Sequence, residues 1–247
     1  MSKTILITGA TSGIGEALAR LAAQSGYHVI ACGRNATKLS ELEQISGIST
    51  LQFDVTDAKA TASALSNVDC DIAVLNAGTC EYVDIETIEP EMFKRVFEPN
   101  FFGVVNCVSA LTPKLKVGHQ IVIVDSLARL LPFTRSQAYG ASKAALHYFT
   151  KSTEVDLADK GVIVQSVSPG FVVTPLTDKN DFKMPMKISV EEAVADMLNG
   201  IEKRSRSVYF PTGFSLMLRF INLLPSAVQR RICVSMKHSM KRGKQSK

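Results

Sequence analysis

This chain lacks the residue patterns that hold metals or disulfide frameworks. It has no tryptophan, its five cysteines form no CxxC pair, and its four histidines show no metal-ligand spacing. We therefore expect no metal site and a reduced, cytoplasmic environment. No uninterrupted run of about 20 apolar residues is present, so no segment is predicted to span a bilayer. The first apolar run, Thr4–Thr8, is too short for a signal peptide.

Acidic residues are almost absent from the C-terminal segment. Residues 201–247 hold 11 Lys and Arg and one acidic residue, Glu202, so this segment carries a net charge of +10 and the preceding residues carry −5. Such a split indicates an interaction segment. Two interpretations stay open: peripheral contact with a membrane surface, or packing over the substrate cleft or a sister subunit. Nucleic acid is not an expected partner, because no nucleic-acid-binding motif accompanies the charge.

What the sequence does contain is a regular alternation of short apolar runs with longer helical stretches. The runs are hydrophobic throughout, which is typical of strands covered by helices on both faces. A chain of 247 residues with this pattern predicts one α/β domain built on a doubly wound parallel sheet. The predicted strands are Thr4–Thr8, Tyr27–Ala31, Thr50–Phe53, Ile72–Leu75, Gln120–Val124, Val162–Val167 and Ser207–Phe210.

A glycine-rich turn follows the first predicted strand. Gly9 allows a sharp turn, and Gly13 and Gly15 open the next helix where a side chain would block a pyrophosphate. The helix N-terminus supplies free N–H groups and a positive potential for phosphates. This turn predicts a dinucleotide site.

The end of the second predicted strand indicates which dinucleotide is bound. A free ribose 2′-OH favours an acidic residue there, and a 2′-phosphate favours a cation. The chain has Gly33 followed by Arg34, so we expect NADP(H) to be preferred over NAD(H), with Arg34 and Ser12 as phosphate ligands. The alternative is that Arg34 only begins a solvated helix.

A proton-transfer group is predicted on the long helix expected over residues 136–159. Tyr139 and Lys143 are four residues apart, so they lie one turn apart on one face. A tyrosine acting near neutral pH needs a neighbouring cation to stabilise its phenolate. Ser126, just after a predicted strand, can donate a hydrogen bond to a carbonyl oxygen. Asp125 beside it either biases the electrostatics of the site or caps a turn, and the turn cap is the favoured interpretation.

Taken in order along residues 4 to about 210, these motifs resemble the short-chain dehydrogenase/reductase (SDR) family. The resemblance rests on Thr8-Gly9-xxx-Gly13-x-Gly15, Asp54-Val55, Asn76-Ala77-Gly78, Asn100, Ser126, Tyr139-Gly-Ala-Ser-Lys143 and Pro169-Gly170-Phe-Val172-x-Thr174. It implies a Rossmann-type fold and hydride transfer between a nicotinamide and a carbonyl/alcohol pair.

The resemblance also assigns roles to residues. The implied catalytic residues are Asn100, Ser126, Tyr139 and Lys143, with Asn100 anchoring a proton-relay water. The expected cofactor-binding residues are Gly9, Thr11, Ser12, Gly13, Ile14, Gly15, Arg34, Asp54, Val55, Asn76, Ala77, Gly78, Tyr139, Lys143, Pro169, Gly170, Val172 and Thr174. Asp54 and Val55 are implied to hold adenine, and residues 169–174 to orient nicotinamide.

These observations predict a catalytic domain over residues 1–210, with a substrate loop at about 175–188, and a basic helical extension over residues 211–247. We expect a small carbonyl or alcohol substrate of apolar character, met by residues 129–133 and the loop after Thr174, and a homo-oligomer of two or four chains. The first alternative is an NADP(H) sensor without turnover that docks a partner or membrane through its basic C-terminus. The second is an oligomeric scaffold built on the small residues of 140–145.

Overall fold

The computed structural model describes residues 2–178 and 184–245, with side chains as far as residue 238. Its centre is a seven-stranded sheet in which every strand runs parallel to its neighbours, in the order β3-β2-β1-β4-β5-β6-β7. The strands are β1 (Thr4–Thr8), β2 (His28–Gly33), β3 (Ile48–Gln52), β4 (Ile72–Leu75), β5 (Gln120–Val124), β6 (Ile163–Pro169) and β7 (Ser207–Phe210). The predicted doubly wound sheet is therefore confirmed.

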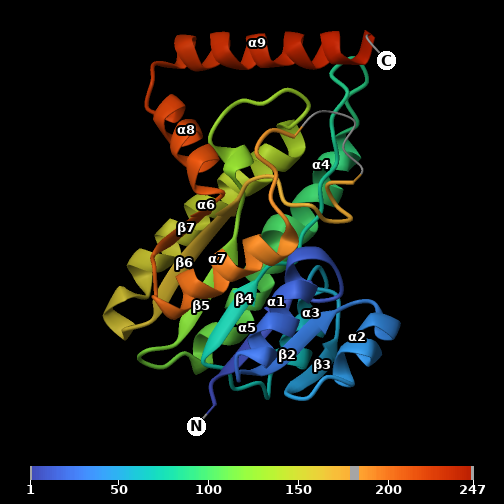
Figure 1. The fold of residues 1–247 in the computed structure, drawn as a ribbon. Coiled ribbons are helices and arrows are strands. Elements are labelled where there is room, and N and C mark those ends of the chain that lie inside the picture. Colours follow the sequence, from blue (N-terminus) through green and yellow to red (C-terminus); the bar gives the residue numbers. More distant parts are fainter. Residues whose placement is uncertain (1, 179–183, 246–247) are drawn as a thin grey trace.

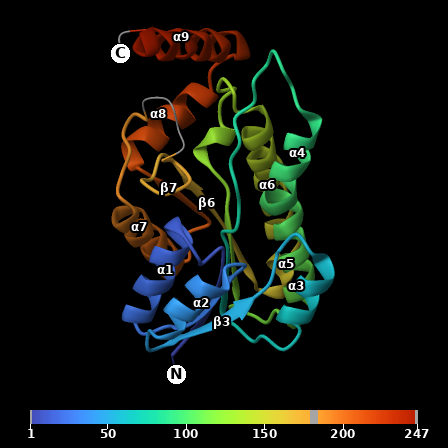
Figure 2. The ribbon, with the colours of Figure 1, turned by 90° about the vertical axis from the view of Figure 1, so that its right-hand side faces the viewer.

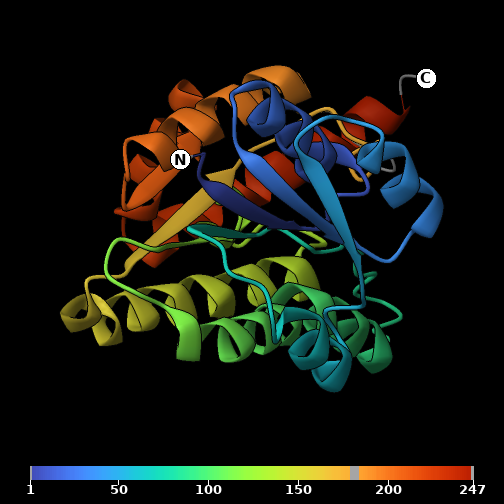
Figure 3. The same ribbon diagram turned by 90° about the horizontal axis from the view of Figure 1, so that it is seen from below.

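Helices cover both faces of this sheet, which explains why its strands are apolar throughout. Every residue of β4 and β5 is buried. Helices α1, α2 and α7 pack on one face of the sheet and form one hydrophobic core with it. Helices α3, α5 and α6 form a second core on the other face (Figure 3). These helices are α1 (Gly13–Gln24), α2 (Ala36–Glu43), α3 (Ala58–Leu65), α5 (Gly103–Leu111), α6 (Gln137–Asp156) and α7 (Val190–Glu202); α4 (Pro90–Phe97) packs beside α6. The result is a three-layer α/β domain.

Helix ends follow local chemistry. Ser189 begins α7 with a capping box, in which its side chain accepts from the Glu192 N–H and the Glu192 side chain accepts from the Ser189 N–H. The helix predicted over residues 136–159 ends earlier, at Asp156. A separate 3-10 turn (Ala158–Lys160) follows, and Gly161 then adopts φ +64°. Glycine adopts this left-handed conformation readily, and Gly161 therefore ends the helical segment.

Two further helices lie beyond the sheet, at the end where the parallel strands finish (Figures 1 and 2). They are α8 (Thr212–Asn222) and α9 (Ser226–Gln245). Phe214 and Leu218 of α8 pack with Leu127, Leu130 and Leu131, and Cys233 of α9 joins this third core. In the described part of the chain, no helix is long and apolar enough to cross a membrane. One face of α8 is buried against residues 127–131.

The strand order reverses between β1 and β4, because β2 and β3 lie on one side of β1 and the later strands on the other. In open α/β sheets a crevice forms at such a point, outside the carboxyl ends of the strands. The glycine turn follows β1, and Asn76 follows β4. Topology thus brings together two of the predicted motifs before any side chain is considered.

Candidate active site

The glycine turn adopts a backbone that only glycine accommodates well. Gly9 and Gly13 have φ values of +68° and +55°. A Cβ on Gly15 would lie 2.2 Å from the carbonyl oxygen of Gly9. Ser12 is the N-cap of α1, and its exposed side chain makes no capping hydrogen bond. The turn therefore leaves the first N–H groups of α1 and the Ser12 hydroxyl available to an anion, and it fits a dinucleotide pyrophosphate.

Thr8 joins this turn to the segment after β4. Its Oγ1 accepts hydrogen bonds from the backbone N–H groups of Asn76 (3.0 Å) and Ala77 (3.2 Å). The Asn76 side chain donates back to the Thr8 carbonyl at 3.2 Å. Thr8 is buried, so these bonds satisfy its hydroxyl. The sequence prediction used Thr8 only as part of a motif, although a buried threonine at the end of a strand is itself a signal for such a link.

Arg34 lies just after β2 and points to Asp54. Its Nη1 is 3.2 Å from Oδ2 of Asp54, and the Arg34 side chain is 76% exposed. Burial raises the pKa of the Asp54 carboxyl, but hydrogen bonds from the backbone and side chain of Thr56, together with Arg34, hold this pKa below its ordinary value. A Cβ on Gly33 would lie 2.6 Å from the Thr11 side chain. The structure thus brings Arg34, Asp54, Gly33 and Thr11 to one corner, with an exposed guanidinium.

Val55 is fixed beside α5. The Asn106 side chain donates to the Val55 carbonyl at 2.9 Å. Gly103 faces the Val55 side chain so closely that a Cβ there would lie 2.6 Å from Cγ2 of Val55. These contacts set the position of the Asp54-Val55 pair.

The Ser126, Tyr139 and Lys143 side chains converge at the end of β5. Ser126 begins a short 3-10 helix, η3 (Leu127–Arg129), where its Oγ accepts from the Ala128 N–H at 3.1 Å. Ser126 is also hydrogen bonded to the phenol of Tyr139. Lys143 donates from Nζ to the Val124 carbonyl at 2.9 Å, and its Nζ lies 6.0 Å from the centre of the Tyr139 ring. The predicted group of three is thereby brought together in space.

Asn100 lies in a π-helix, η1 (Glu98–Phe102), directly before α5. Its Oδ1 accepts from the Thr79 N–H at 2.7 Å, and its Nδ2 donates to the Thr79 carbonyl and to Oγ of Ser142, both at 2.9 Å. A Cβ on Gly78 would lie 2.8 Å from Oδ1 of Asn100 and 3.5 Å from Nζ of Lys143. Asn100 and Lys143 therefore both lie close to Gly78. π-helical turns such as η1 often occur at functional sites.

Burial sets the protonation of the central pair. It raises the pKa of Tyr139 well above its ordinary value, with further contributions from Cys80 and Asp125, while the hydrogen bond with Ser126 opposes the rise. Burial lowers the pKa of Lys143 to about 8, and Asp125 and Cys80 counteract this. Near neutral pH the site thus holds a protonated phenol beside a lysine that is mostly cationic.

Cys80 is a residue of this site that the sequence prediction missed. Burial raises its pKa to about 11, and a hydrogen bond with Tyr82 and the charge of Lys143 oppose this rise. The thiol is therefore neutral near pH 7. Among the residues that the structure describes, no group of three or more His, Cys, Asp or Glu is placed to hold a metal ion.

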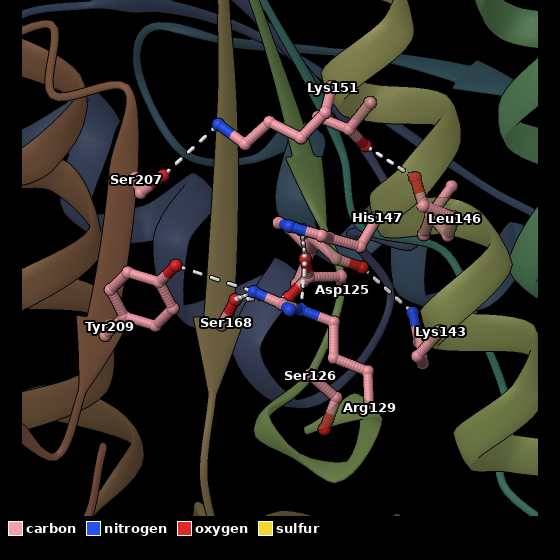
Figure 4. A network of polar contacts seen from close by, with 12 residues as sticks. Asp125, Ser126, Arg129, Lys143, Leu146, His147, Lys151, Ser168, Ser207 and Tyr209 are labelled. Carbon is pink, nitrogen blue, oxygen red and sulfur yellow. Dashed lines mark hydrogen bonds and ion pairs between the residues drawn. The ribbon is translucent and has the colours of Figure 1, made fainter. Parts of the chain in front are cut away.

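Asp125 is the centre of a buried polar network directly beside Ser126 (Figure 4). Its side chain is fully buried, and its Oδ2 lies 3.0 Å from Nε of Arg129 and 2.7 Å from Nδ1 of His147. Ser168 on β6 donates to the other carboxylate oxygen. Arg129 extends towards Ser168 and Tyr209 on β6 and β7, at 3.4 and 3.5 Å. One carboxylate thus links β5, β6, η3 and α6.

This network corrects one interpretation made from the sequence and adds one residue beside the site. Asp125 does not cap a turn, because Ser126 caps η3 and the Asp125 carboxylate faces Arg129 and His147. In the sequence His147 is only one of four histidines without metal-ligand spacing, but in the structure it contacts Asp125, the residue next to Ser126. The missed signal is its spacing: His147 follows Lys143 by four residues, as Lys143 follows Tyr139, so all three share one face of α6.

The segment after β6 closes the site on another side. Thr174 faces the glycine turn, since a Cβ on Gly13 would lie 3.4 Å from its side chain. Gly170 is bound to β7 through a 2.7 Å hydrogen bond to the Phe210 carbonyl, and Val172 is buried and bridges Ile188. The predicted substrate loop at 175–188 includes residues 179–183, which lie outside the described residues.

The segment predicted to meet the substrate, residues 129–133, is largely committed to packing. Arg129 is held by Asp125, and Leu130 and Leu131 are buried against α8. Together with an outer face of α6 and with α9, this segment lines a groove of about 600 Å³. Its contact with a substrate stays a prediction.

A strand-order reversal beside a glycine turn and a Ser-Tyr-Lys group indicates the class of the protein, a dinucleotide-dependent oxidoreductase. The family model for short chain dehydrogenase matches residues 3–184. The chain is 35% identical over 237 residues to an uncharacterised oxidoreductase of Myxococcus xanthus, covering 91% of this chain and 93% of that one. It is 37% identical over 186 residues to serine 3-dehydrogenase of Rhizobium radiobacter, covering 72% and 75%.

A solved structure gives the same result. A short chain dehydrogenase from Burkholderia cenocepacia in complex with NADP superimposes with a TM-score of 0.84 at 27% identity, covering 93% of this chain and 97% of that one. Similar folds have been solved with NAD as well. This chain therefore belongs to the short-chain dehydrogenase family and is an oxidoreductase of that family.

We expect replacement of Asp125 by asparagine to destabilise the fold by about 3–5 kcal/mol, because it leaves the buried Arg129 guanidinium without its counter-charge. Urea unfolding at pH 7 measures this change. Glu91→Gln is the matched control. Its carboxylate lies 2.7 Å from Lys94 but is exposed, so its loss should cost less than about 1 kcal/mol. Equal stability of the two variants would contradict a structural role for the network.

Proposed function

We propose that this chain is an NADP(H)-dependent reductase that interconverts a small carbonyl compound and its alcohol, with Tyr139 as the general acid/base. The observation that carries the proposal is the convergence of Ser126, Tyr139 and Lys143 at the end of β5. The cofactor, when bound, supplies hydride to the carbonyl carbon. The glycine turn, Asp54-Val55 and residues 76–78 fit its nucleotide end, and Pro169–Thr174 its nicotinamide end.

The protein side of the reaction follows from the protonation of the site. Tyr139 holds a proton on its phenol oxygen and gives it to the carbonyl oxygen as negative charge grows there. Ser126 is hydrogen bonded to that phenol, so its hydroxyl lies close enough to donate a hydrogen bond to the carbonyl oxygen of the substrate as well. Lys143 then stabilises the phenolate that is left. In the reverse direction the phenolate takes the proton from the alcohol.

Asn100 is proposed as the support of the site, holding a proton-relay water near Lys143. Its side chain joins residue 79 to α6, and both Asn100 and Lys143 lie close to Gly78. This location supports the role. None of the observations favours a nucleotide sensor without turnover, because Ser126, Tyr139 and Lys143 are all present and in contact range.

The expected assembly stays a proposal. Exposed apolar side chains on η1 and α6 support a homo-oligomer: Phe102, Tyr148 and Val155 are 48%, 79% and 74% exposed. A second copy would cover them. Cytoplasmic location and the division at residues 210 and 211 are proposed on the sequence grounds given above.

We expect Tyr139→Phe to lower kcat by about 10²- to 10⁴-fold, because the ring stays in place but the proton is lost. Turnover of a carbonyl panel with NADPH measures this, and NADPH titration should give an almost unchanged Kd. Tyr148→Phe is the matched control on the same helix, since Tyr148 is 79% exposed. Full turnover by Tyr139→Phe would exclude the proposed mechanism.

The proposed NADP(H) preference rests on Arg34. We expect Arg34→Ala to weaken NADPH binding by about 10- to 100-fold, the value of charge-assisted hydrogen bonds, and to leave NADH binding nearly unchanged. Fluorescence titration with both cofactors tests this. Lys94→Ala, another exposed cation in an ion pair, is the control. A parallel loss for NADPH and NADH would show that Arg34 does not recognise the 2′-phosphate.

The reduction should also slow at alkaline pH. The pKa of Lys143 is about 8, so the lysine is cationic below this value and neutral above it, whereas the pKa of Tyr139 is raised and the phenol stays protonated. We therefore expect kcat/KM for reduction to fall as pH rises through about 8, by up to tenfold per pH unit. Circular dichroism over the same range checks that the fold persists. A flat profile between pH 7 and 9 would contradict this assignment.

A further inference from the structure

Helix α8 is apolar on two opposite faces, although only one face has a protein partner in the described structure. Phe214 and Leu218 are buried against residues 127–131. On the other side, Leu216, Phe220 and Leu223 are 56%, 66% and 83% exposed. A surface helix of a soluble domain usually has a polar outer face. A double-sided apolar helix at the surface marks an interaction site.

We define the outer face of α8 as Leu216, Met217, Phe220 and Leu223, the last of these directly after the helix. This surface continues towards the substrate loop. Met186 is 57% exposed, and its Cε lies 3.7 Å from the place that a Cβ on Gly213 would take. The outer face of α8 is therefore part of a wider apolar surface and is not a single exposed side chain.

The charged residues in the C-terminal part of the chain, which carries this surface, have one sign. From residue 203 to the end, the chain contains 11 Lys and Arg and no Asp or Glu. Arg230, Arg231 and Lys237 on α9 are all exposed. Arg219 on α8 lies over the Tyr209 ring, 4.6 Å from its centre, beside the outer face of α8. Apolar side chains with flanking cations and no acids are the composition of helices that lie in the interface of anionic membranes.

We propose that the outer face of α8 and the cations of α8 and α9 dock this protein on an anionic lipid surface, without spanning it. Leu216, Phe220 and Leu223 would enter the boundary between headgroups and acyl chains, and the cations would lie at the lipid phosphates. A second copy of the chain is a poorer occupant, because a two-fold contact would place two strongly basic segments against each other. The proposal does not depend on the reaction that the site catalyses.

The full-length protein is tested by co-sedimentation with vesicles of phosphatidylcholine alone and of equimolar phosphatidylcholine and phosphatidylglycerol, at low salt. We expect binding to the anionic vesicles and little binding to the neutral ones. Phe220→Ser/Leu223→Ser should weaken binding by about 10- to 100-fold, since two apolar side chains are lost. Arg230→Gln/Arg231→Gln/Lys237→Gln should weaken it by about fivefold per cation.

Val117→Ser is the matched control. Val117 is 83% exposed, like Leu223, but it precedes β5 at the amino ends of the strands. Its vesicle binding should equal that of the unmodified protein. Circular dichroism and NADPH titration show whether each variant is folded, and the charge variant, which alters only exposed side chains, provides a second test if the serine variant does not fold.

Three results would overturn the proposal. The first is that the unmodified protein does not bind anionic vesicles. The second is equal binding to neutral vesicles, which would remove the role of the cations. The third is that the serine variant dissociates an oligomer in light scattering while neither form binds vesicles, which would assign the outer face of α8 to a second copy.

Discussion

The fold and the site both depend on one constraint, the parallel pairing of all seven strands. Because the strands run in one direction, their carboxyl ends meet at one edge of the sheet, and the segments that leave them meet there too. The glycine turn after β1, Asn76 after β4, Ser126 after β5 and Gly170 after β6 are far apart in the chain and adjacent in space. The helices add Tyr139 and Lys143 from one side only, through a single face of α6.

Around this edge, backbone groups do much of the positioning. The Lys143 ammonium is held by the carbonyl of Val124, the last residue of β5, and the Thr8 hydroxyl is held by two N–H groups after β4. Such bonds fix a side chain to the sheet itself. Since a sheet deforms less easily than a loop, these bonds hold the side chains of the site in fixed positions relative to the sheet.

Much of this arrangement could be predicted from the sequence, because strands buried on both faces leave an unmistakable apolar pattern. The strands Thr4–Thr8, Ile72–Leu75, Gln120–Val124 and Ser207–Phe210 were predicted with their observed bounds. The Asp125 network could be predicted only in part. The spacing of His147 places it on the face of α6 that carries Lys143, but Arg129 and Ser168 are joined to Asp125 by tertiary packing and each alone is an ordinary polar residue. The sequence also could not predict that α8 has one buried and one exposed apolar face, because composition shows that a helix is apolar but not which face is covered.

The Asp125 network makes two parts of the protein inseparable. In many enzymes a loop beside the substrate can be exchanged while the catalytic residues stay as they are. Here Arg129 lies in the segment 129–133 and also binds the Asp125 carboxylate, which joins β5 to α6. Asp125 is next to Ser126 in the chain, and its partner His147 is one helical turn from Lys143. Within residues 129–133, Leu130 and Leu131 are buried against α8 and Arg129 is bound to Asp125, so a substitution at any of these three positions also disturbs either the third core or the Asp125 network.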